Sequence, residues 1–192
     1  MLTRLKVSGF RSLGNVDVRF GPFACVAGPN SSGKSSLIEA IAFLGALAGR
    51  PFREAVPAHD PGGPRAVALE AEMIVPREGV DELGQNAEAS ITFLRYGVEL
   101  DVRDGSFVLA KEELSHITLG EARQELPFPH SAAWRQAAVT GARRVPYFIS
   151  THCEEGRRLI KIHQDQVPAR PRALAAATLD RKSTRLNSSH RL

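Results

Sequence analysis

The 192-residue chain has little of what marks a secreted, membrane-spanning or disulfide-stabilised protein. It has only two cysteines, Cys25 and Cys153, and their wide separation argues against a local metal-binding pair and a disulfide framework. No apolar run reaches the roughly 18 residues that would span a bilayer, and residues 1–10 contain no apolar signal-peptide core. We therefore expect no membrane partner and a cytoplasmic location in which both thiols are reduced.

The composition is that of an ordinary globular domain, because 43% of the residues are hydrophobic and 24% are charged. These fractions exclude a disordered chain and a collagen-like fibre. The net charge of +4 would by itself favour a polyanionic partner such as nucleic acid. However, four of the 25 basic and one of the 21 acidic residues lie in 180–192, and without them the net charge is only +1. The excess of positive charge therefore belongs mostly to the C-terminal segment.

The sequence of the C-terminal segment, residues 180–192, points to an origin outside the gene. Asp180–His190 resembles the conceptual translation of a common short-read sequencing adapter, codon for codon over eleven residues. The alternative is an ordinary basic tail. On the adapter interpretation we expect 180–192 to be a non-native tail, which is excluded from fold reasoning. Residues 1–179 are then expected to be the N-terminal part of a longer protein.

Three strands are predicted before residue 28. Leu2–Gly9 and Val16–Phe20 have the alternating apolar and polar residues of half-buried strands. Phe23–Ala27 is a continuous apolar run, which predicts a strand buried on both faces. Cys25 would then be a small core residue.

A helix pattern follows a glycine- and serine-rich loop. Its apolar residues recur on one predicted face, which consists of Leu37, Ile41, Leu44 and Ala48. Gly49 stands where a glycine often ends a helix, and Pro51 cannot continue it. Residues 1–50 are therefore predicted to form a strand–loop–helix unit.

The region 65–165 is predicted to be a β-rich subdomain with one short helix. An Asp104-Gly105 pair favours a tight hairpin turn, and Ser131 is a candidate N-cap for the helix. The predicted elements are strands at Val67–Val75, Val98–Arg103, Phe107–Ala110, Tyr147–Thr151 and Arg158–His163, and a helix from Trp134 to Val139.

The loop Gly28–Ser35, with the sequence GPNSSGKS, fits the pattern G-x-x-x-x-G-K-[ST] of a phosphate-binding loop. Glycines let consecutive backbone N–H groups turn toward phosphate oxygens, and the following helix adds the positive end of its dipole. Lys34 is predicted to reach the β- and γ-phosphates, and Ser35 to ligate a Mg²⁺ ion that bridges them. The alternative is a chance match in a turn, which the predicted strand before the loop and the helix after it argue against.

A wider pattern surrounds this loop. A short N-terminal strand, the sequence Gly9-Phe10-Arg11-Ser12-Leu13, a second strand and then Gly28–Ser36 are similar to the SMC/RecF-like ABC-class ATPases, many of which are described as AAA-family ATPases. The specific motifs cover residues 1–50, and from Val67 to His163 only the β-rich character agrees. The resemblance implies an α/β fold, namely the N-terminal lobe of a P-loop NTPase with a β-rich antiparallel subdomain, incomplete in this chain.

The motif and the resemblance together give a candidate site for ATP and Mg²⁺. Arg11 matches an arginine that lies near the nucleotide phosphates in the family, and the alternative is a solvated arginine in a turn. Ser36 matches an α-phosphate contact, whereas Ser31 replaces the glycine that the family most often has. The candidate residues are Gly28, Asn30, Ser31, Ser32, Gly33, Lys34, Ser35, Ser36 and Arg11, with Ser35 as the Mg²⁺ ligand.

The chain lacks the motifs that hydrolysis needs in this family, which are an apolar strand ending in Asp-Glu, a Leu-Ser-x-Gly-like signature and a late histidine. No catalytic residue is therefore identified, and we expect the chain alone to bind nucleotide weakly without hydrolysing it. For the intact protein the resemblance implies an ATPase whose two copies hold ATP between their heads, with DNA as a candidate partner. The alternatives are a non-hydrolysing, nucleotide-gated DNA-binding or interaction module, and another P-loop class such as a small kinase or GTPase.

Two further features are assigned to ordinary structure. His152–Glu155 holds potential metal ligands, but no second Cys/His cluster accompanies it, so the segment is predicted to be a hairpin edge. The pairs Arg143-Arg144 and Arg157-Arg158 could contact DNA phosphates, and solvated turns are the favoured alternative. No metal site is therefore predicted outside the phosphate-binding loop.

Overall fold

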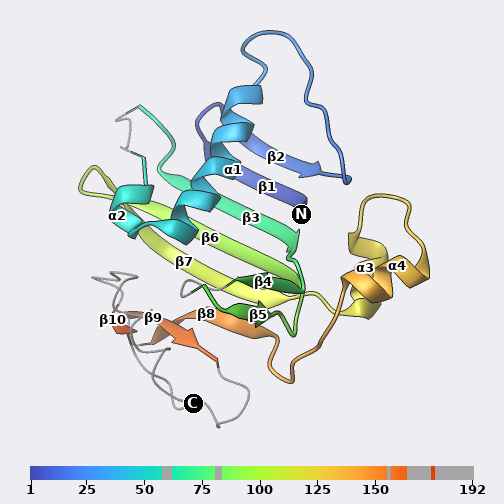
Figure 1. Ribbon diagram of the computed structural model, residues 1–192. Coiled ribbons are helices and arrows are strands. Elements are labelled where there is room, and N and C mark those ends of the chain that lie inside the picture. Colours follow the sequence, from blue (N-terminus) through green and yellow to red (C-terminus); the bar gives the residue numbers. More distant parts are fainter. Residues whose placement is uncertain (58–61, 81–83, 155–156, 164–173, 176–192) are drawn as a thin grey trace.

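The computed structural model describes residues 1–57, 62–80, 84–154, 157–163 and 174–175 (Figure 1). The strands are β1 (Leu2–Phe10), β2 (Leu13–Arg19), β3 (Ala66–Ile74), β4 (Glu78–Val80), β5 (Asn86–Glu88), β6 (Phe93–Arg103), β7 (Ser106–His116), β8 (Tyr147–Glu154), β9 (Arg157–Ile162) and β10 (Leu174–Ala175). The helices are α1 (Lys34–Gly49), α2 (Phe52–Ala55), α3 (Leu119–Glu125) and α4 (Ala132–Ala138).

Within these residues one eight-stranded sheet dominates, in the order β10-β9-β8-β7-β6-β3-β1-β2, with every neighbouring pair antiparallel. The β4–β5 pair forms a separate two-stranded ribbon. Figure 1 shows α1 lying along one face of the sheet and α3 and α4 at one end of it. Strands from the predicted 1–50 unit and from the predicted 65–165 subdomain thus share one sheet, and the predicted α/β class with a β-rich antiparallel part is confirmed. None of the helices described here is long and apolar enough to cross a membrane.

Helix α1 packs on the sheet through one apolar stripe. Its buried residues are Leu37, Ala40, Phe43 and Leu47. The predicted face was only partly right: Leu37 is buried and Leu44 is half-buried, whereas Ile41 is 38% exposed and Ala48 is exposed. Because apolar residues surround much of this helix, their period alone does not show which side contacts the sheet.

The prediction of a buried strand at Phe23–Ala27 was wrong. The segment is irregular and exposed, with Phe23 at 89% and Val26 at 46% exposure. Cys25 is also exposed, so it is not the core residue that the apolar run predicted. A strand needs a neighbour for its backbone hydrogen bonds, and in the described part of the chain no strand pairs with this segment. Apolar composition predicts burial but does not supply the partner.

The hairpins of the β-rich region are confirmed. The turn at Asp104-Gly105 joins β6 to β7, and both residues have positive φ angles of 51° and 72°. The β8–β9 hairpin is also as predicted, although its turn residues 155–156 lie outside the described part. The predicted tail 180–192 lies outside it too. Helix α3 was missed, although its capping box from Thr118 to Glu121 is readable in the sequence.

The end of the sheet carries a second small core. Its buried members are Phe93, Ile117, Ala122, Leu126 and Val139, which join β6 and β7 to α3 and α4. The N-cap predicted at Ser131 is confirmed, since its hydroxyl accepts a hydrogen bond from the backbone N–H of Trp134 at 3.0 Å. These contacts fix both short helices to the sheet, because helices of this length are not stable alone.

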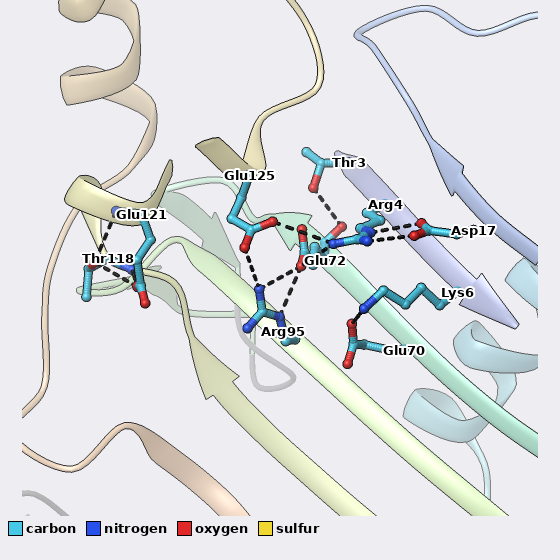
Figure 2. Close-up of polar contacts among 10 residues, drawn as sticks. All are labelled: Thr3, Arg4, Lys6, Asp17, Glu70, Glu72, Arg95, Thr118, Glu121 and Glu125. Atoms are coloured by element: carbon cyan, nitrogen blue, oxygen red, sulfur yellow. Dashed lines mark hydrogen bonds and ion pairs between the residues drawn. The ribbon is translucent and has the colours of Figure 1, made fainter. Parts of the chain in front are cut away.

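A buried carboxylate links the strands to α3 (Figure 2). The Glu72 side chain is fully buried, and its Oε1 accepts hydrogen bonds from Arg95 Nε at 3.0 Å and Nη2 at 2.8 Å. Arg95 also reaches Glu125 of α3 at 3.2 Å. Arg4 lies 3.8 Å from Glu72 and binds Asp17 through two hydrogen bonds, which lower the pKa of that carboxyl. The second Glu72 oxygen has no hydrogen-bond partner among the described residues, so Glu72 depends on its arginines.

Arg95→Ala is expected to lower the free energy of unfolding by about 3 kcal/mol, because it leaves the buried Glu72 carboxylate without its main partner. Urea denaturation of the two proteins measures the difference. The double variant Glu72→Gln with Arg95→Met removes the charge together with its partner and should recover most of the loss. A double variant as unstable as Arg95→Ala would contradict this account.

Two histidines share one hydroxyl on the β8–β9 hairpin. The buried Ser150 Oγ lies 2.8 Å from His152 Nε2 and 2.7 Å from His163 Nε2. Partial burial, followed by the nearby positive charges of His152, Arg143 and Lys161, lowers the pKa of His163. No cluster of three or more metal-ligating side chains is found among the described residues.

Acid is expected to destabilise the chain partly through His163. Its pKa is lower in the folded state than the ordinary value of 6.5, so as the pH falls below about 6.5 the unfolded state takes up the proton first. Stability is then lost below that pH and is unaffected above it. Thermal unfolding between pH 7.5 and 5.5 should show a smaller loss in His163→Gln than in the unchanged chain. An equal loss in both would contradict the assignment.

Candidate functional site

The predicted phosphate-binding loop leads directly into α1. Ser31 and Gly33 have left-handed backbone angles, with φ of 64° and 91°, which curl the loop before the helix starts. The first helical hydrogen bond is donated by Leu37 N–H to Gly33 C=O at 3.0 Å. The N–H groups before Leu37 have no intrahelical partner, and no described side chain caps them. They are therefore available to an anion at the positive end of the helix dipole.

Lys34 closes this loop with its own side chain. Its Nζ donates hydrogen bonds to the carbonyl oxygens of Gly28 at 2.8 Å and Pro29 at 2.6 Å. An ammonium group has three N–H donors, so one remains for a ligand after these two bonds. The lysine both shapes the loop and places a positive charge beside it. The first turn of α1 contains no acidic residue that would oppose an anion there.

The two glycines of the motif lie where a side chain would meet close neighbours, and Gly33 also has a backbone conformation that favours glycine. A Cβ at Gly33 would lie 3.1 Å from Leu13 Cδ2 and would sit on a backbone with φ of +91°. A Cβ at Gly28 would lie 3.0 Å from Ser32 Oγ. The two glycines of the motif thus permit the tight turn and the close approach of neighbouring groups.

The β1–β2 turn lies against the N-terminal half of α1, beside the phosphate-binding loop. Phe10 pairs with Leu13, so Arg11 and Ser12 alone make the turn. Ser12 Oγ lies 2.8 Å from Ser36 Oγ, and Arg11 Nε lies 2.8 Å from an Oε atom of Glu39. The structure therefore brings Arg11 to the phosphate-binding loop's helix, where its partner is Glu39.

The remaining candidate residues lie on the loop and at the start of α1. Asn30, Ser31, Ser32 and Ser35 are exposed on the loop and the first helical turn. The Ser35 hydroxyl is an oxygen donor of the kind that Mg²⁺ prefers. Sequence reasoning missed Ser12 and Glu39. The spacing of Ser36 and Glu39, one helical turn apart, indicates a shared helix face, but nothing in the sequence shows that the β1–β2 turn lies against it.

Known proteins share this part of the chain. The family described as "AAA domain" matches residues 4–63. The DNA replication and repair protein RecF of Actinobacillus pleuropneumoniae serotype 5b is 31% identical over 120 residues, which are 60% of this chain and 30% of that protein. RecF of Erwinia tasmaniensis is 49% identical over 53 residues, which are 27% of this chain and 14% of that protein. The OLD nuclease of Thermus scotoductus is 44% identical over 41 residues, or 21% and 8% of the two chains.

A solved structure from work on ATP-driven dimerisation and DNA-stimulated activation of SMC ATPases covers 67% of this chain and 81% of its own, with 19% identity and a TM-score of 0.36. The chain spans at most about 30% of the length of these RecF proteins. The family match includes the whole loop and the Arg11 turn. The family match and the RecF relatives confirm the predicted resemblance to RecF-like P-loop ATPases.

Gly33→Ala is expected to destabilise the chain by about 1 kcal/mol, because alanine tolerates the left-handed backbone poorly. Gly45→Ala is the matched control within α1, where a Cβ meets nothing within 4 Å. There alanine should stabilise the helix by up to about 1 kcal/mol. Thermal unfolding of both variants measures the two effects, and equal shifts of the same sign would contradict the assigned loop geometry.

Proposed function

We propose that this chain is the ATP-binding N-terminal lobe of an SMC/RecF-like ATPase, with ATP and Mg²⁺ bound at Gly28–Ser36. The observation that carries the proposal is the loop itself, in which Lys34 spans two loop carbonyls at the open N-terminus of α1. The phosphate groups of a nucleoside triphosphate fit this site, because their oxygens accept hydrogen bonds from several N–H groups at once.

Each group has a separate part in binding. The backbone N–H groups of the loop and of the first helical turn hold phosphate oxygens. Lys34 adds its third N–H donor and its charge, and the Ser35 hydroxyl holds Mg²⁺. When bound, that ion neutralises charge on the β- and γ-phosphates. Arg11 supplies a second cation from the β1–β2 turn.

The activity of the intact protein is the second part of the proposal. We infer an ATPase whose two copies hold ATP between their heads, which acts in the cytoplasm with DNA as a partner. The support is the similarity to proteins named for DNA replication and repair. A non-hydrolysing, nucleotide-gated DNA-binding or interaction module is the alternative, and the presence or absence of an apolar strand ending in Asp-Glu in the intact protein discriminates between them. ATP turnover by the intact protein, with and without DNA, separates the two.

Lys34→Ala is expected to weaken Mg-ATP binding by about 10- to 100-fold, since it removes a charged hydrogen-bond donor from the site. Isothermal titration calorimetry of the intact, full-length protein measures the affinity. Lys6→Ala is a suitable control, because Lys6 pairs with Glu70 on the sheet instead of lying on the loop. Unchanged ATP affinity in Lys34→Ala would refute the proposed site. A preference for GTP over ATP would point instead to the GTPase class.

A further inference from the structure

The β1–β2 turn is strained at the residue that faces the candidate site. Arg11 has a φ of 54°, in the left-handed region that favours glycine or asparagine. The tight connection between Phe10 and Leu13 imposes this conformation on the turn. A side chain kept at such a position costs free energy, and residues of this kind concentrate at functional sites. The contacts of Arg11 are therefore informative.

Two side-chain contacts tie this turn to α1. Ser12 Oγ meets Ser36 Oγ at 2.8 Å, and Arg11 Nε meets Glu39 Oε2 at 2.8 Å. Ser36 and Glu39 are three residues apart, so they lie on adjacent turns of one helix face. The turn thus runs along α1 from its first turn to its second. Glu39 is one helical turn further from the open N-terminus than Ser36 is.

We propose that Glu39 and Ser12 are positioning residues of the nucleotide site. Glu39 holds the Arg11 guanidinium beside the second turn of α1, one turn from the open N-terminus, and Ser12 orients the Ser36 hydroxyl. This inference rests on the proposed function, since it concerns the same ligand. Glu39 engages Arg11 through Nε, and the two terminal nitrogens have no partner among the described residues. They can donate to phosphate oxygens while Nε stays bound.

The Arg11–Glu39 ion pair contributes more to the position of the Arg11 side chain than to the free energy of unfolding. Both side chains are about half exposed, and such pairs contribute little to folding. A long arginine side chain loses conformational freedom when it is fixed on a ligand. Glu39 fixes the guanidinium before the ligand arrives, so less of that loss falls on binding.

The chain offers a closely matched control pair. Arg77 Nε lies 2.8 Å from Glu88 Oε1 with similar exposure, on the β4–β5 ribbon and its approach instead of on α1. Glu39→Ala should weaken Mg-ATP binding to the intact, full-length protein by about two- to fivefold, the range of an exposed ion pair. Glu88→Ala should leave it unchanged. Glu39→Gln removes the negative charge while keeping the length of the side chain, so it should weaken binding about as much as Glu39→Ala. Ser12→Ala should weaken binding by a similar factor.

A second comparison tests whether Glu39 acts through Arg11. In an Arg11→Ala background, Glu39→Ala should cause no further loss of ATP affinity. Arg11→Gly should weaken binding as much as Arg11→Ala without lowering the midpoint of thermal unfolding, because glycine tolerates the positive φ. Additive losses in the double variant, or wild-type affinity in Glu39→Ala, would overturn the inference. Lys34→Ala distinguishes failure of this inference from failure of the proposed function. If Lys34→Ala also binds ATP with unchanged affinity, the proposed nucleotide site itself is wrong.

Discussion

The packing of α1 on the sheet is the constraint on which the candidate site depends. The helix buries Leu37, Ala40, Phe43 and Leu47 against the strands. Phe43 stacks on Phe10 with ring centroids 5.7 Å apart. Because Phe10 is the last residue of β1, this contact brings the β1–β2 turn to the helix. The loop, the helix N-terminus and the Arg11 turn are therefore held in one frame by a single apolar interface.

Strand β1 connects that interface to the buried charges of the sheet. Its far end carries Arg4, which lies near Glu72 and Glu125 and binds Asp17. A buried carboxylate persists only when its partners remain in place, so this network opposes any shift of β1 against β3 and β6. The same strand thus carries an electrostatic anchor at one end and the apolar contact with α1 at the other. Stability of the sheet and geometry of the loop are coupled through it.

Features that depend on neighbouring residues could be predicted from the sequence. The phosphate-binding loop, the Asp104-Gly105 turn and the Ser131 cap are of this kind, because each is fixed by the backbone preferences of a few residues. Features that need a distant partner could not. Phe23–Ala27 has the composition of a strand but lies unpaired and exposed, and the buried side of α1 is chosen by the sheet. Ser12 and Glu39 could not be predicted as site residues for the same reason, because the contacts between the β1–β2 turn and α1 exist only once β1 is packed on that helix.

The chemical groups of the candidate site are also local, in the sense that they come from neighbouring elements of the chain. The candidate nucleotide-binding groups all lie between Arg11 and Glu39, within one local unit. Except for Glu39, they are hydrogen-bond donors or oxygens that can ligate a metal ion. Glu39 is a carboxylate near the loop, but one of its oxygens is engaged by Arg11 at 2.8 Å. Under the proposed function, this local unit supplies the groups that bind the phosphates.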